Sequence, residues 1–154
     1  MRNSMIVVVA TAVLATALVF ARAQQAPTAV TVEVFKTPTC GCCGVWVEHL
    51  RANGFTVVAH EVDQAELDGI AREAGLGTEL RSCHTAKVGG YAVEGHVPAA
   101  DIKRLLAERP EVAGIAVPGM PVGSPGMEMG DRRDPYNVVA FTRDGRRSVF
   151  AQYR

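Results

Sequence analysis

VTVEVFKTPTCGCCGVW, residues 30–46, joins a strand pattern to a cysteine-rich turn and the start of a helix. β-branched residues recur at alternate positions from Val30 to Lys36, which predicts a strand that stops at Thr37-Pro38. From about Cys42 to Asn53, apolar residues recur at three- and four-residue steps, which predicts a helix. The cysteines are therefore expected at the end of a strand and the N-terminus of a helix.

The rest of the sequence predicts a mixed α/β fold. The patterns give a strand at 55–62, a helix at 64–74, a hairpin at 86–93, a helix at 97–108 and a terminal hairpin at 136–153. Between the last two, residues 117–135 hold four Pro, four Gly and three Met in a loop. The order strand, helix, strand, helix, hairpin, helix is that of a thioredoxin-like domain, with the loop and a hairpin added. We expect one such domain over residues 30–154.

The first 23 residues have the pattern of a secretory signal peptide. Arg2 precedes an apolar run at 5–20, and Ala21-Arg22-Ala23 provides a small-x-small cleavage pattern. The alternative is an uncleaved anchor, but the run of 16 residues is short of the ~20 that span a bilayer. We expect residues 1–23 to be removed, residues 24–29 to be a flexible leader, and no later segment to span a membrane. Export would place the cysteines in an oxidising space.

Charge and length exclude some classes of function. Removing residues 1–23 takes away Arg2 and Arg22 and no acid, which changes the net charge from 0 to −2. Basic residues are scattered, and adjacent pairs such as Arg132-Arg133 and Arg146-Arg147 do not resemble a recognition stripe, so we expect no nucleic-acid partner. The remaining 131 residues can bury a real core, and the four cysteines are therefore not needed as staples.

Three cysteines lie within four residues, Cys40, Cys42 and Cys43. A helix N-terminus favours the thiolate form, which both metal binding and disulfide exchange use. Cys40 and Cys43 have the C-x-x-C spacing of a dithiol oxidoreductase, but a third thiol between them offers a competing partner. That extra thiol is an advantage for Cu(I), which takes soft sulfur donors and can share a bridging thiolate. A Cys40–Cys43 disulfide with two leftover thiols remains the alternative.

Cys83-His84 and His96 are further candidate ligands. Cys83-His84 stands where the chain re-enters the predicted sheet, which in a thioredoxin-like domain lies near the first helix N-terminus. His96 precedes a predicted helix, from which its side chain could turn toward the same place. The alternatives are an ordinary buried cysteine beside a surface histidine, and a capping or solvent-facing His96. His49 and His60 fit a helix surface and a strand face, and we leave both out.

Met120, Met127 and Met129 form a second unusual group. Flanking Gly and Pro prevent a helical core stripe here, and thioethers bind Cu(I) while they discriminate against zinc. The alternative is a loop that folds back and buries its methionines over an apolar patch.

Four separated motifs resemble the small periplasmic CopG-type copper-resistance proteins, a metal-binding family long catalogued as a domain of unknown function. The motifs are KTPTCGCCGVW at 36–46, SCHT at 82–85, GYAVEGHVPA at 90–99, and GMP with GSPGME at 119–121 and 123–128. The resemblance covers nearly the whole chain after residue 23. It implies a thioredoxin-like fold, copper bound through Cys40, Cys42, Cys43 and Cys83, and copper handling or Cu(I)/Cu(II) interconversion in the periplasm.

Our leading hypothesis is a periplasmic protein that holds Cu(I) in a thiolate-bridged cluster for copper resistance. His84, His96 and the three methionines would be accessory ligands or transfer points for the metal. Two alternatives stay open: a thiol or copper oxidoreductase using Cys40 and Cys43, and a chaperone that passes copper to an exporter or multicopper oxidase. Whether the protein is an enzyme is not decided by its residues.

Overall fold

The structure, a computed structural model, describes residues 30–154. The signal peptide and leader predicted for residues 1–29 lie outside the described residues. None of the helices in the described range has the length and apolarity that crossing a lipid bilayer requires.

Strands and helices follow one another in a mixed α/β order. They are β1 (Thr31–Lys36), α2 (Gly41–Ala52), β2 (Thr56–Glu61), α3 (Gln64–Glu73), a 3-10 turn (Thr78–Leu80), β3 (His84–Val88), β4 (Tyr91–Glu94), α4 (Ala99–Glu108), β5 (Gly114–Ala116), β6 (Tyr136–Phe141) and β7 (Arg147–Tyr153). Every strand and helix expected from the sequence is present, with ends that differ by at most two residues. The sequence did not predict β5, whose three residues are too few to show a period.

The seven strands form one mixed sheet in the order β2-β1-β3-β4-β5-β6-β7. β1 pairs parallel with β2 and antiparallel with β3, and the β3–β4 hairpin turns at Gly89-Gly90 as expected. β5 pairs parallel with β4 and antiparallel with β6. The predicted terminal hairpin is the β6–β7 pair, so it extends the same sheet.

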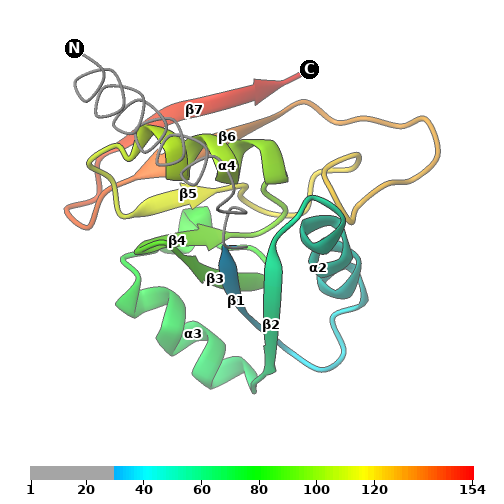
Figure 1. Ribbon diagram of the computed structural model, residues 1–154, viewed down its shortest axis with the longest axis horizontal. Helices are drawn as coiled ribbons and strands as arrows, with labels where there is room; N and C mark the ends of the chain where they lie inside the picture. The colour runs from blue at the N-terminus through cyan, green and yellow to red at the C-terminus, as the bar shows by residue number, and fades with distance from the viewer. Residues whose placement is uncertain (1–29) are drawn as a thin grey trace, which may run out of the picture.

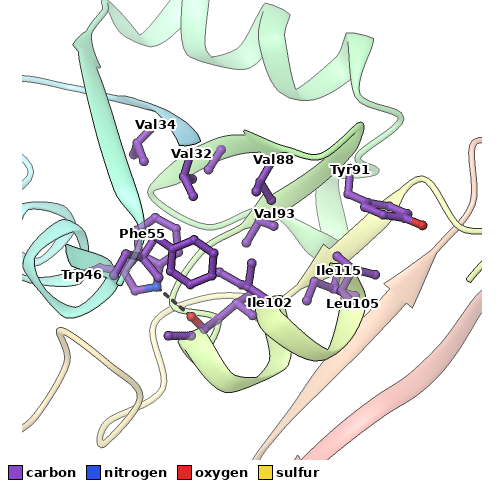
Figure 2. Packing of buried hydrophobic residues seen from close by; sticks show 14 of the residues in the cluster. Val32, Val34, Trp46, Phe55, Val88, Tyr91, Val93, Ile102, Leu105 and Ile115 are labelled. Carbon is purple, nitrogen blue, oxygen red and sulfur yellow. Dashed lines mark hydrogen bonds between the residues drawn. The ribbon is translucent and has the colours of Figure 1, made fainter. Parts of the chain in front are cut away.

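Helices cover both faces of the sheet (Figure 1). The larger core cluster joins the sheet to α2 and α4 through Trp46, Leu50, Ile102 and Leu105, all with no exposed surface. Figure 2 shows Trp46, Ile102 and Leu105 together with other aromatic and aliphatic side chains of this cluster. A second cluster, which includes Ala71 of α3, lies on the other face. The sheet residues of this second cluster are Ala92 of β4, Ala116 of β5 and Phe141 of β6.

Helix α2 begins at the cysteines and is fixed by its apolar stripe. Cys43, Trp46, Val47 and Leu50 are its buried residues, at the three- and four-residue spacing read from the sequence. The indole Nε1–H of Trp46 donates to the carbonyl of Val97 at 2.9 Å, which ties α2 to the segment before α4 (Figure 2).

Candidate metal centre

Four cysteine sulfurs meet at the N-terminus of α2. Cys40 is the N-cap residue, Cys42 and Cys43 lie in the first turn, and Cys83 immediately precedes β3. The four Sγ atoms all lie within 4.8 Å of one another. The Cys42 sulfur is 3.6 Å from that of Cys40 and 3.9 Å from that of Cys83. With metal–sulfur bonds of 2.3 Å, the edge of a tetrahedral site is about 3.8 Å, so the spacing suits shared ligation of a metal.

The structure joins Cys40 and Cys43 in a disulfide and leaves Cys42 and Cys83 as free thiols. This is the pairing that the sequence left open as the alternative to four thiols. A disulfide sulfur is not a thiolate, and the thiolate is the form that binds metal. Ligation by all four sulfurs therefore requires reduction of the Cys40–Cys43 bond.

Two imidazoles, those of His84 and His96, lie beside Cys83. Cys83 also belongs to the group of four cysteines, Cys40, Cys42, Cys43 and Cys83, which we call the sulfur cluster. The Sγ of Cys83 lies 3.4 Å from Nδ1 of His84 and 3.2 Å from Nε2 of His96. Both rings are fully buried, and their ligand atoms lie within 4.8 Å of one another and of the sulfur. His96 therefore points toward Cys83, as expected, and does not face solvent.

Neighbouring groups fix the two rings. Nδ1 of His96 is hydrogen-bonded at 2.8 Å to the carbonyl oxygen of Pro125; because a carbonyl only accepts, Nδ1 carries the proton. Nε2 of the neutral ring then presents its lone pair toward Cys83. His84 packs against the indole of Trp46 with ring centroids 4.3 Å apart, and against the edge of His96 at 5.1 Å.

Burial keeps these groups uncharged when no metal is present. Burial, and after it the neighbouring Cys42, raise the pKa of the Cys83 thiol to about 12. Burial lowers the pKa of His84 to about 3 and also lowers the pKa of His96. Neutral imidazole is the form that binds metal, so the histidines are ready to act as ligands at neutral pH. Cys83 would release its proton on binding.

A buried carboxylate positions the backbone at Cys83. Glu94 accepts the Ser82 backbone N–H at 2.7 Å, the Arg81 Nε–H at 3.3 Å and the Thr85 hydroxyl at 2.6 Å. Burial raises its pKa, although the hydrogen bonds oppose this shift. Glu94 is missed by reasoning from the sequence alone, because a single acidic residue at a strand end is commonly a solvated one. Its only sequence signal is its place between the apolar Tyr91-Ala92-Val93 and Gly95.

The Pro/Gly/Met loop, residues 117–135, packs against the site. A Cβ added to Gly126 would lie 2.8 Å from the carbonyl oxygen of Cys42, so loop backbone rests on the first turn of α2. The Ser82 hydroxyl donates to the carbonyl of Gly119 at 2.5 Å, which attaches the loop beside Cys83. The loop passes close to α2 in Figure 1.

The three methionines of the loop differ in exposure. Met120 and Met129 are 53% and 55% exposed, and Met127 is half-buried. Burial over an apolar patch therefore does not describe Met120 or Met129. Their part in metal binding stays a prediction. His49, which was not among the expected ligands, accepts the backbone N–H of Ala99, the first residue of α4, at 3.1 Å.

Comparisons with known proteins agree with the motifs. A family described as "Protein of unknown function, DUF411" matches residues 80–127, which include Cys83, His84 and His96. No curated protein matches the chain. Two solved structures, titled "Copper resistance protein copG", Form 2 and Form 1, are each 49% identical over 82% of this chain, with a TM-score of 0.77. The match covers 100% and 98% of those chains. At this identity and coverage, the chain belongs to the CopG copper-resistance protein family.

Proposed function

We propose that this protein binds copper as Cu(I) through Cys40, Cys42, Cys43 and Cys83 when all four are reduced. The observation that carries the proposal is the convergence of four sulfurs within 4.8 Å at one helix N-terminus. Soft thiolates select Cu(I) over harder cations, and bridging sulfurs allow more than one copper ion. The titles of the two similar structures, which name copper resistance, support the choice of metal.

The proposed setting is the periplasm, after removal of residues 1–23. A thioredoxin-like core, formed by β1 to α4, would carry the site. The strand order β2-β1-β3-β4 and the position of the C-x-x-C spacing at the start of α2 support this assignment. His84 and His96 would be accessory ligands next to Cys83. Met120, Met127 and Met129 would transfer copper between the site and a periplasmic exporter or multicopper oxidase.

The experiment is a copper titration of the fully reduced protein under anaerobic conditions, followed by desalting and metal analysis. The proposal requires copper to remain on the protein after desalting. A parallel sample with the Cys40–Cys43 disulfide intact should retain less Cu(I), because two of the four sulfurs are then not thiolates. The proposal fails if the reduced protein, with four titratable thiols, retains no copper.

A second candidate function is thiol–disulfide exchange. The observation in its favour is the Cys40–Cys43 disulfide at the N-terminus of α2, where an attacking thiolate is stabilised. Insulin reduction measures this activity. If C42S reduces insulin as well as the unaltered protein does, exchange through Cys40 and Cys43 is favoured. Loss of copper in C42S would favour the metal site.

A further inference from the structure

Cys83 belongs to two different groups of potential ligands. One is the sulfur cluster, and the other is the set Cys83, His84 and His96, which we call the imidazole site. None of the three members of the imidazole site takes part in the Cys40–Cys43 disulfide. The oxidised protein therefore loses half of the sulfur cluster but keeps the whole imidazole site.

The distances in the imidazole site are those of a metal site. Bonds of 2.3 Å to sulfur and about 2.0–2.1 Å to nitrogen place the sulfur and a nitrogen about 3.5 Å apart in a tetrahedral centre. The observed separations from the Cys83 sulfur are 3.4 Å to His84 and 3.2 Å to His96. Only small side-chain adjustments would be needed to admit an ion.

The surroundings also resemble those of a metal site. Ligating histidines usually donate their second N–H to a carbonyl or carboxylate, which fixes the ring and its tautomer. His96 does this through Nδ1 and Pro125 at 2.8 Å, and its Nε2 is therefore directed at Cys83. His84 is held by contact with Trp46 and His96. Both rings are positioned before any ion binds.

The donor set decides which ion fits. One thiolate and two imidazoles form a borderline set, suited to divalent ions such as Zn²⁺ and Cu²⁺, whereas the four-sulfur set suits Cu(I). We propose that the disulfide form of this protein binds one borderline divalent cation through Cys83, His84 and His96. Reduction of Cys40–Cys43 would add two thiolates beside Cys83 and change the preferred ion. Because both sites use Cys83, the two ions compete for one sulfur.

The test uses purified protein whose disulfide is verified by mass: alkylation of the unfolded, unreduced protein should label two thiols, Cys42 and Cys83. Zn²⁺ alone is titrated by calorimetry, and Co²⁺ alone is used as a spectroscopic probe. We expect one equivalent of Zn²⁺, a sulfur-to-cobalt charge-transfer band, and the intense visible bands of four-coordinate Co²⁺. X-ray absorption at the zinc edge should show one sulfur and two imidazoles. No charge-transfer band, or more than one sulfur, would overturn the proposal.

Variants separate this site from the sulfur cluster. H96Q and C83S should each weaken Zn²⁺ binding at least about tenfold, the usual cost of disturbing a metal site. H60Q is the matched control, since His60 is a 40% exposed side chain on β2 that lies by Glu33. The disulfide form of C42S should bind Zn²⁺ as well as the unaltered protein. Loss of Zn²⁺ binding in C42S, or unchanged binding in H96Q, would overturn the assignment.

The imidazole site goes beyond the proposed Cu(I) function, and the two can fail separately. If the reduced protein retains no Cu(I) and the disulfide form shows histidine-dependent Zn²⁺ binding, the Cu(I) proposal is contradicted and the imidazole site is supported. If the reduced protein retains Cu(I) and the disulfide form binds no divalent ion, the Cu(I) proposal is supported and the imidazole site is contradicted.

Discussion

Nδ1 of His96 donates to the carbonyl oxygen of Pro125 at 2.8 Å, and this bond joins the Pro/Gly/Met loop to the metal centre. His96 lies just before α4, whereas Pro125 is 29 residues further along the chain. The opposite edge of the same imidazole faces Cys83 at 3.2 Å. The loop therefore sets the orientation of His96, a candidate ligand. Substitutions that move the loop backbone should change the position of this imidazole relative to Cys83.

Gly126→Ala should disturb this arrangement. The new Cβ would lie 2.8 Å from the Cys42 carbonyl oxygen and 3.0 Å from the Trp46 backbone nitrogen, at a backbone φ of +85°. We expect a loss of about 2–4 kcal/mol in the free energy of unfolding, measured by urea denaturation. Gly130→Ala is the control, because its φ is +59° and nothing lies within 4 Å. It should cost only about 1–2 kcal/mol. Equal losses in the two variants would show that the loop does not rest on α2.

Cys42 and Cys83 should differ in reactivity when no metal is bound. Burial raises the pKa of Cys83 to about 12, so at pH 7 this thiol stays protonated, and its alkylation should speed up as the pH rises toward that value. We expect iodoacetamide to modify Cys42 at least about tenfold faster than Cys83 at pH 7. Peptide mass mapping over time measures both rates in the disulfide form. Faster modification of Cys83 would contradict the raised pKa of this half-buried thiol.

Glu94→Gln should loosen the backbone at Cys83. The carboxylate accepts from Ser82, Arg81 and Thr85, and an amide has a single acceptor oxygen and no charge to offer Arg81. A loss of about 1–3 kcal/mol in unfolding free energy is expected, by urea denaturation. Glu108→Gln, on the exposed part of α4, should change stability by less than about 0.5 kcal/mol. A Glu94→Gln protein as stable as this control would show that the three hydrogen bonds do not constrain Ser82 and Cys83.

The sequence predicted what depends on periodicity. The stripe of Cys43, Trp46, Val47 and Leu50 places the cysteines at the start of α2, since one helix face must be buried against the sheet. Alternation of apolar and polar residues predicted the longer strands, since one face of each strand must likewise be buried. β5 could not be predicted, because three residues are too few to show a period. Its place between β4 and β6 is set by its pairing with both strands.

The site was only partly readable from the sequence. The predicted thioredoxin-like order placed Cys83 near the cysteine turn. The C-x-x-C spacing could not decide between a Cys40–Cys43 disulfide and four free thiols, because both fit it. The role of Glu94 depends on hydrogen bonds to residues 9 to 13 positions away, which leave no pattern in the chain. The orientation of His96 depends on the Pro125 carbonyl, a backbone group that no residue type reveals.

The central claim is that the sulfur cluster, including Cys42, holds copper. Cys42 lies between Cys40 at 3.6 Å and Cys83 at 3.9 Å, where its sulfur can bridge ions held by its neighbours. The most direct measurement is the copper content per chain of fully reduced C42S after desalting, beside the reduced unaltered protein and H60Q. We predict that C42S retains less copper per chain, while H60Q retains as much as the unaltered protein. Equal copper content in C42S and the unaltered protein would contradict the account.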